Sequence, residues 1–414
     1  MFMSTRQSQL LGLAIATLAL CLVLAYVGQW AYTTFAPKPT PIPPTATPGP
    51  TPTPTPLGPL TINYYVAPSA EDYFRQAAQS YNATKPSVSG RPVQVAIFPV
   101  DSISAWRKFE SETMTPLPHA WVPESRVFPL LVNETLGAKR GKDVFFEGGQ
   151  YRIQPTLLSV PVFVYFNSRY QVLQSKFGAG NLGWRTVFTA TSASGWQALG
   201  GPASYGIFRW IEGNPLKDPV AVYGIQNAAG AYFGRPAVGP DDLDNAGFKA
   251  FMKTILASSA NLGLGSYGLD DLRLFRYSFG DGGVFMEKDV LDHLAEASKW
   301  DDPLRVVYPE YVSWLDYPVA IWMGDEFSAD DKNATLDFSR YVRSRPMQEL
   351  AVQMGFRPVN EEVIASQVAQ SPFLRWKDVG VAADITRLQG MRFLNRDVLN
   401  AILNFYRQDI LGQR

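Results

Sequence analysis

The chain has 414 residues, and its 37 basic and 37 acidic side chains give a formal net charge of zero. This balance argues against a nucleic-acid-binding protein, which needs a basic face. One Cys and two His argue against a disulfide framework and against a His-rich zinc site. The length exceeds that of one ordinary domain, and a hydrophobic fraction of 46% is enough for a sizeable core.

Apolar residues dominate positions 10–35, and no charge interrupts them. A helix of this length suits a hydrocarbon core roughly 30 Å thick. Trp30 and Tyr32 lie near its end, where amphipathic rings favour the headgroup layer, and Arg6 favours a cytoplasmic N-terminus over residues 1–9. We therefore expect a single-pass protein of the cell membrane. This helix would hold it in the lipid bilayer, with the C-terminal domain on the extracytoplasmic side.

Two other interpretations of this segment stay open. A cleaved signal peptide has a shorter apolar core of roughly 7–15 residues and a small-residue cleavage site, which the end of this run does not offer. A lipoprotein would be modified at Cys21, but Leu20 precedes this residue and the apolar run continues through Val27. A simple apolar role for Cys21 in a helix accounts for both facts. The uncleaved anchor is therefore the preferred interpretation.

Pro and Thr dominate residues 36–59. Such a segment cannot bury apolar surface and lacks many amide donors, so it predicts an extended polyproline-type linker. At about 3.1 Å per residue, the linker could hold a domain several nanometres from the membrane. Recognition by a proline-binding domain is the alternative.

The domain from residue 60 onward opens with a strand, a helix and a second strand. Residues 60–66 and 93–98 have strand character, and the apolar residues between them recur at helical spacing. This order indicates a parallel unit, in which ligands gather where strands end and helices begin. Ser69 lies at such a place, with Asp72 three residues later as in a capping box. Ser69 is thus a candidate ligand-binding residue, and a plain helix cap is the alternative.

Further strands and helices alternate along the chain in the manner of an α/β domain. The patterns predict strands within 118–125, 157–167 and 282–287, helices at 248–256 and from Ser328 to about 344, and added helices in the tail beyond Pro372.

The sequence contains none of the common motifs for nucleophilic catalysis, phosphate binding or paired-Cys chemistry. There is no Gly-x-Ser-x-Gly elbow, no Gly-rich phosphate loop and no Cys-x-x-Cys pair. We therefore expect no enzyme activity, no catalytic residue, no metal ligand and no cofactor. Two carboxylates could still meet from anywhere in the fold, so a carbohydrate-active enzyme is kept as an alternative.

The order of these motifs resembles that of the extracellular solute-binding proteins of bacterial ABC transporters, including the type associated with von Willebrand A domains. The resemblance extends over roughly residues 60–360. His119 stands where the family often has Asp, and a loop Ser that often contacts ligand is missing near Asn214. The matching motifs are Ala120-Trp121-Val122-Pro123-Glu124-Ser125, Ser159-Val160-Pro161-Val162, Gly195-Trp196 with Leu199, Tyr308-Pro309, Asp316-Tyr317-Pro318 and Gly355-Phe356-Arg357-Pro358.

The resemblance implies a two-lobed, periplasmic-binding-protein-like fold of type II, which closes on its ligand like a hinge. Lobe 1 would comprise about 60–160 plus 305–414, and lobe 2 about 161–304. Four further ligand-binding residues are expected beside Ser69: Trp121 as a stacking face, Ser125 in a turn after a strand, Asn214 in a loop and Glu287 near the second hinge. For Glu287, a surface position beside Lys288 is the alternative.

The implied function is capture of a small solute, such as a sugar or an anion, and its delivery to an ABC-type permease. A cell-surface sensor or interaction module with the same fold is the main alternative. The 10 Trp and 19 Tyr would suit sugar stacking, although large aromatic residues usually belong to the core.

Overall fold

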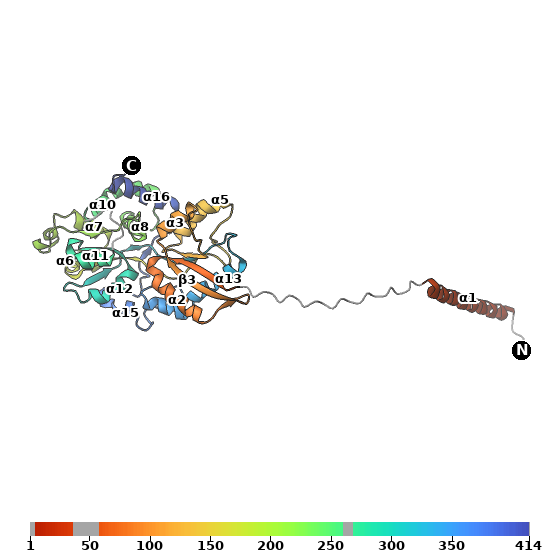
Figure 1. Ribbon diagram of the computed structural model, residues 1–414. Helices are drawn as coiled ribbons and strands as arrows, with labels where there is room; N and C mark the ends of the chain where they lie inside the picture. Colours follow the sequence, from red (N-terminus) through yellow and green to blue (C-terminus); the bar gives the residue numbers. More distant parts are fainter. Residues whose placement is uncertain (1–4, 36–57, 260–267, 414) are drawn as a thin grey trace. The chain divides into compact units, whose positions relative to one another are not determined.

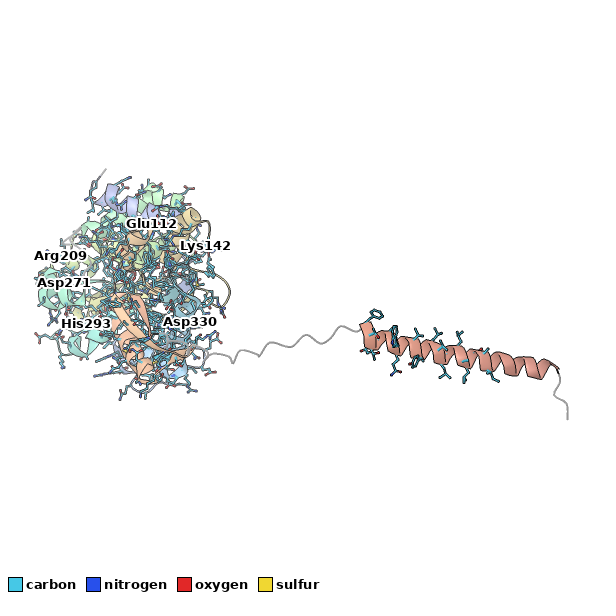
Figure 2. All side chains as sticks on the ribbon, turned by 45° about the vertical axis from the view of Figure 1, so that its right-hand side comes forward. Glu112, Lys142, Arg209, Asp271, His293 and Asp330 are labelled. Atoms are coloured by element: carbon cyan, nitrogen blue, oxygen red, sulfur yellow. The ribbon has the colours of Figure 1, made fainter. Side chains whose placement is uncertain are left out.

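The computed structural model describes residues 5–35, 58–259 and 268–413, and the chain divides into two units (Figure 1). The first unit holds helix α1 (Thr5–Phe35), in which the stretch Ile15–Phe35 is long and apolar enough to cross a membrane. The side chains of Ile15–Phe35 are almost all exposed and point outward from the helix (Figure 2). An exposed apolar surface of this size is unfavourable in water and suits a lipid environment. Most of the predicted Pro/Thr-rich linker lies outside the described residues.

A six-stranded sheet forms one half of the second unit, which begins at Leu57. In spatial order its strands are β2 (Ser87–Val88), β3 (Arg91–Pro99), β1 (Leu60–Val66), β4 (Ala120–Val122), β11 (Pro318–Ile321) and β5 (Gln154–Pro155). Strand β1 pairs in parallel with β3 and β4, as the strand–helix–strand pattern predicts, while β11 runs antiparallel to β4. Ile62 and Tyr64 are buried along β1 whereas Thr61 is exposed, the alternation of a strand with one core face.

A four-stranded sheet forms the other half. In spatial order its strands are β7 (Trp210–Ile211), β8 (Gly282–Met286), β6 (Pro161–Phe166) and β9 (Leu304–Val307). All six residues of β6 are buried, which explains its continuous apolar sequence. Gly282 is required by close packing, because a Cβ atom there would lie 2.5 Å from the carbonyl oxygen of Val164.

Helices cover both sheets. In the first half, α2 packs against β3 and α13 packs against β1 and β11; in the second half, α6, α8 and α12 contact the sheet directly. The larger helices are α2 (Glu71–Ala83), α3 (Ser102–Glu110), α4 (Val127–Val132), α6 (Asn167–Phe177), α7 (Trp184–Ser192), α8 (Pro219–Phe233), α10 (Ala246–Ala257), α11 (Leu269–Phe275), α12 (Glu287–Ala297), α13 (Ala329–Val342), α14 (Arg345–Gln353) and α16 (Arg396–Phe405). The predicted capping box is present at α13, where Ser328 and Asp331 bond each other's backbone amides.

The two halves are the lobes of a mixed α/β fold. Where the chain passes from one lobe to the other, its backbone is hydrogen-bonded to neighbouring segments. Ser159 forms a bridge with Leu315, and Leu158 forms a bridge with Arg357. Strand β9 still belongs to the second sheet, so the second crossing falls after it and before β11, a few residues beyond the predicted boundary at 304/305.

The C-terminal tail crosses once more. After α14, apolar tail residues such as Phe373 and Ile385 join a buried cluster with Leu291 of α12, and α16 packs against α8 and α9 (Pro240–Asp244). The predicted run of tail helices is wrong in part: Gln389–Gly390 forms strand β12, which pairs with β10 (Tyr311–Val312), and α16 begins only at Arg396. The tail therefore packs largely on the second lobe, whereas the predicted boundaries assigned it to the first.

Candidate functional site

A cavity of about 300 Å³ lies between the two lobes. The first lobe contributes Pro68, Ser69, Asp101 and Glu124. The second lobe contributes Lys217, Asp218, Pro219, Val220, Gly268, Leu269, Val284, Phe285, Met286 and Asp289. Both lobes thus line one cavity, at the ends of strands and the starts of helices, where ligands gather in open α/β sheets.

Two carboxylates line the cavity from the first lobe. Asp101 follows β3 and caps α3, since its Oδ1 accepts a hydrogen bond of 2.7 Å from the amide of Ser104. Glu124 follows β4 and is 6% exposed, and its Oε2 atom forms no hydrogen bond of normal geometry with the described residues. The Ser102 hydroxyl acts on this carboxyl and partly offsets the rise of its pKa, but it too lacks a hydrogen bond of normal geometry. An unpaired buried carboxylate oxygen is costly, so this atom requires an explanation.

A tight turn places Asp218 on the second-lobe side. The carbonyl oxygen of Asn214 accepts hydrogen bonds from the amides of Lys217 and Asp218, at 2.9 and 2.8 Å. Asp218 then caps α8, accepting a hydrogen bond of 2.8 Å from the amide of Val220. Gly213 makes room for it, because a Cβ atom there would lie 2.4 Å from Oδ2 of Asp218.

Asp289 completes the acidic lining. It lies in the first turn of α12, directly after β8, whose last residues Phe285 and Met286 also line the cavity. Within the part of the chain that the structure describes, none of the four lining carboxylates forms an ion pair with a basic side chain. Lys217 is the basic residue in the lining, and its side chain is exposed.

Burial raises the pKa of three of these carboxyl groups. The pKa of Glu124 rises to about 7, because burial removes its carboxylate from water and because Asp101 and Asp218 add negative charge nearby. Burial likewise raises the pKa of Asp218 to about 7 and that of Asp289 to about 6. The groups act on one another: Asp289 and Asp101 both contribute to the shift of Asp218. The lining of the cavity therefore disfavours negative charge.

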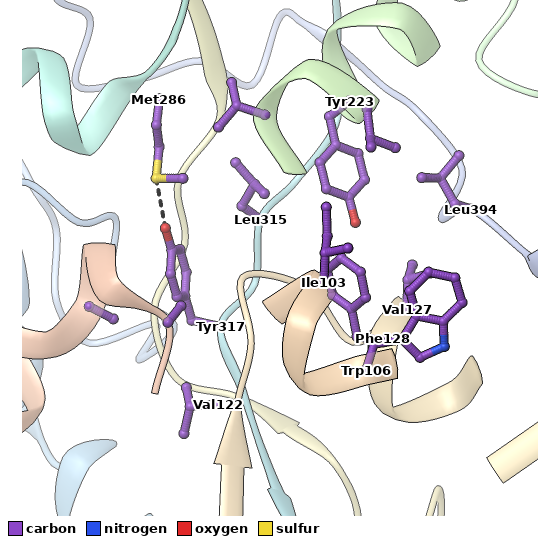
Figure 3. Packing of buried hydrophobic residues seen from close by; sticks show 14 of the residues in the cluster. Ile103, Trp106, Val122, Val127, Phe128, Tyr223, Met286, Leu315, Tyr317 and Leu394 are labelled. Atoms are coloured by element: carbon purple, nitrogen blue, oxygen red, sulfur yellow. Dashed lines mark hydrogen bonds between the residues drawn. The ribbon is translucent and has the colours of Figure 1, made fainter. Parts of the chain in front are cut away.

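Tyr317 of the first lobe links Ser69 of the same lobe to Met286 of the second lobe. The Ser69 hydroxyl lies 2.9 Å from the Tyr317 hydroxyl, which lies 2.7 Å from the Met286 sulfur (Figure 3). The alternative of a plain helix cap is wrong for Ser69, because Pro68 starts a 3-10 turn and α2 begins at Glu71 without a side-chain cap. Its hydroxyl is thus left for Tyr317 and the cavity.

The structure places the other predicted site residues outside the cavity lining. Trp121 is fully buried among Phe109, Phe128 and Phe145, and Ser125 is fully buried with its Oγ 3.3 Å from the amide of Val127. Ser69 and these residues are therefore not brought together on one surface, and ligand contact by Trp121 and Ser125 stays a prediction.

Asn214 and Glu287 have structural partners as well. The Asn214 side chain accepts a hydrogen bond of 2.9 Å from the amide of Leu216, which helps to form the turn that presents Lys217 and Asp218. Glu287 is 1% exposed, so the alternative of a surface position is wrong. Its carboxylate binds Arg357 and accepts a hydrogen bond of 2.5 Å from the hydroxyl of Tyr308.

The four lining carboxylates were not among the predicted site residues. Asp101 after β3 and Asp218 before α8 are polar residues at the start of a helix, as Ser69 is between β1 and α2. Glu124 lies beside the predicted Ser125, and Asp289 lies two residues from the predicted Glu287. The predicted Ser69 lines the cavity, whereas near Ser125, Asn214 and Glu287 it is a residue one to four positions away that lines it.

Neither protein-family models nor the sequences of curated proteins match the chain. Its fold is similar to several solved structures. UgpB from Mycobacterium tuberculosis in complex with glycerophosphocholine has a TM-score of 0.59 and 14% identity, with 85% of this chain and 93% of that chain covered. The ferric binding protein from Campylobacter jejuni has a TM-score of 0.55 and 12% identity, with 85% and 100% covered. A putative spermidine/putrescine ABC transporter from Listeria monocytogenes has a TM-score of 0.53 and 13% identity, with 84% and 97% covered. At these identities the likeness shows the two-lobed, periplasmic-binding-protein-like fold.

Proposed function

We propose that this chain is an extracytoplasmic solute-binding protein of the kind that serves ABC transporters. Helix α1 anchors it in the cell membrane as a single-pass protein, and the two-lobed unit captures a small solute and presents it to an ABC-type permease. The observation that carries the proposal is the cavity of about 300 Å³, which is lined from both lobes of a two-lobed fold. Closure of the lobes on a ligand in such a cavity is the mechanism expected of this architecture.

The fold neighbours support a binding role without indicating the solute. Their names refer to glycerophosphocholine, iron and spermidine or putrescine, which differ in charge and size. Anchoring would keep the binding unit near a permease and so raise its effective concentration there.

The alternatives make different predictions. A sensor or interaction module would not need a solvent-filled cavity, and this cavity is not filled by side chains of the described residues. A carbohydrate-active enzyme gains some support from the raised pKa values of Glu124 and Asp218, which suit a general acid. Turnover of a glycan by the purified chain would favour the enzyme.

A solute screen followed by small-angle scattering tests the proposed function. The full chain in detergent micelles is screened for thermal stabilisation by solutes, and a solute at a hundred times its dissociation constant should add about 2.7 kcal/mol to the free energy of unfolding. Scattering should then show compaction of the two-lobed unit with that solute. Stabilisation without compaction would contradict lobe closure, and the absence of both would contradict the proposal.

A further inference from the structure

The geometry points to an organic cation, an aliphatic amine or diamine, as the ligand of the interlobe cavity. This inference rests on the proposed solute-binding function and names its substrate class. It differs from the sugar or anion that the resemblance led us to expect.

The charged residues around the cavity are mostly acidic. Asp101 and Glu124 face it from the first lobe, and Asp218 and Asp289 face it from the second. Lys217 is the single basic residue of the lining, and its side chain is exposed to solvent. Closing the lobes brings the two acidic pairs toward one enclosed space, which repels an anion and attracts a cation.

The buried carboxylate of Glu124 is a separate reason to expect a cation, whatever the number of acidic residues in the lining. Its side chain is more than nine-tenths buried and lines the cavity, and Oε2 accepts no hydrogen bond of normal geometry from the described residues. The one neutral group that acts on this carboxyl from a neighbouring side chain, the Ser102 hydroxyl, supplies no positive charge. Buried carboxylates are normally paired with a cation or satisfied by hydrogen bonds. An ammonium group supplies both, because it carries a positive charge and up to three N–H donors.

The arrangement of the acids selects between kinds of cation. Across the described residues, no group of three or more His, Cys, Asp or Glu side chains converges as a metal site would require. The carboxylates are instead distributed on both sides of the cavity, and two of them already cap helices through one oxygen each. A chain with ammonium groups at its ends fits separated carboxylates better than a single metal ion does.

Apolar side chains provide the remaining wall. Val220, Leu269, Phe285 and Met286 line the cavity, and each is buried. A methylene chain can pack against such side chains, whereas the hydroxyl-rich rim of a sugar would lose hydrogen bonds to water there.

Calorimetry on the full chain in detergent micelles tests this inference. The probes are 1,4-diaminobutane and spermidine, the matched neutral 1,4-butanediol, maltose, sulfate and calcium ions. We expect binding of at least one amine and no binding of the diol. Binding of maltose or sulfate without any amine would overturn the inference and leave the proposed function standing. Binding of calcium in preference to every amine would overturn it in favour of a metal site. Binding of no probe at all, with no compaction by scattering, would contradict both proposals.

Conservative variants test the named carboxylates. Glu124→Gln keeps the shape of the side chain and removes its charge, and Asp218→Asn keeps a residue that caps helices well. Each should weaken amine binding by about ten-fold or more, as loss of one partner of a buried charge pair does. Asp325→Asn, which removes a largely exposed carboxylate paired with Lys142, is the matched control and should bind as the unaltered chain does. Unchanged amine affinity in both cavity variants would overturn the inference.

Discussion

Arg357 and Glu287 form a buried, bidentate ion pair between the lobes. The guanidinium donates hydrogen bonds of 2.8 and 2.7 Å to the two carboxylate oxygens, and both side chains are at most 7% exposed. Glu287 begins α12 in the second lobe, whereas Arg357 follows α14 and its backbone pairs with Leu158 at the first crossing. Arg357 also donates to the carbonyl oxygens of two tail residues, Ala382 and Ala383. The pair thus fixes one point at which both lobes and the tail meet.

The substitution Glu287→Gln should therefore act on stability. It leaves the buried guanidinium of Arg357 without a counter-charge, and breaking such a pair typically costs about 3–5 kcal/mol. The free energy of unfolding, measured by urea denaturation of the full chain in micelles, should fall by that order. The control is Glu349→Gln, which removes the exposed partner of Arg345 and should cost about 0–1 kcal/mol. Equal stability of both variants would contradict this account.

Two substitutions of Trp121 should distinguish a role in core packing from a role in ligand binding. Its Nε1 has no hydrogen-bond partner among the described residues, so Trp121→Phe loses packing and no hydrogen bond. Trp121→Ala should lower the free energy of unfolding by about 3–5 kcal/mol, as expected for a large buried ring, and Trp121→Phe by less. Once a solute is identified, Trp121→Phe should bind it as the unaltered chain does. A ten-fold loss of affinity in this folded variant would instead confirm the predicted stacking role.

The stability of the unliganded chain should fall as pH rises from about 5 to 8. Between the ordinary pKa of 4.5 and the raised pKa of about 7, Glu124 holds a proton in the folded chain that it releases in the unfolded chain. The folded state therefore binds more protons in this window, and raising the pH through it costs up to about 3 kcal/mol. Asp218 acts in the same direction, as its pKa is also raised to about 7.

The variant Glu124→Gln provides the comparison for this pH dependence. It removes one of three carboxyl groups whose pKa burial raises into this range, the other two being those of Asp218 and Asp289. Its melting temperature should fall less steeply between pH 5 and 8 than that of the unaltered chain. Parallel curves for the two proteins would show that Glu124 does not titrate in this range.

The full-length chain should stay in the membrane fraction after a carbonate wash. This expectation follows from the uncharged apolar stretch of α1, which contains no acidic or basic residue between positions 10 and 35. Leu20→Arg places a charge near its middle, at a cost of about 2.5–3.5 kcal/mol for insertion, and should shift part of the protein to the soluble fraction. Release of a shortened chain starting near Pro37 would show cleavage, and lipid labelling at Cys21 would show a lipoprotein.

The elements of the fold were predictable where the sequence carries a local signal. The strand at β1, the capping box at Ser328 and the helix at α10 all depend on residues within a few positions of one another. Helix α8 was missed although Asp218 and Pro219 mark its start, because its residues are buried on nearly every side and show no amphipathic period.

The site was less predictable because its partners are distant in sequence. Arg357 lies 70 residues from Glu287, and no local pattern links them. In the short strand β4 and the following turn, Trp121, Glu124 and Ser125 are near neighbours, and only the tertiary packing decides that Glu124 faces the cavity while the other two face the core. Composition and spacing identify such a turn, but they do not determine the direction of each side chain.

Arg396 links the C-terminal tail to the first lobe. It starts α16, which packs on the second lobe, and its guanidinium pairs with Glu110 and Glu134 of the first lobe at 2.9 and 2.6 Å. Two bodies joined by neighbouring strands can bend and also twist relative to one another. A third contact, at α3 and the segment after α4, lies outside both strand crossings, so twisting the lobes would break it. Its ion pairs are partly exposed and should contribute about 0–1 kcal/mol each, so we expect this contact to favour bending over twisting by a small margin.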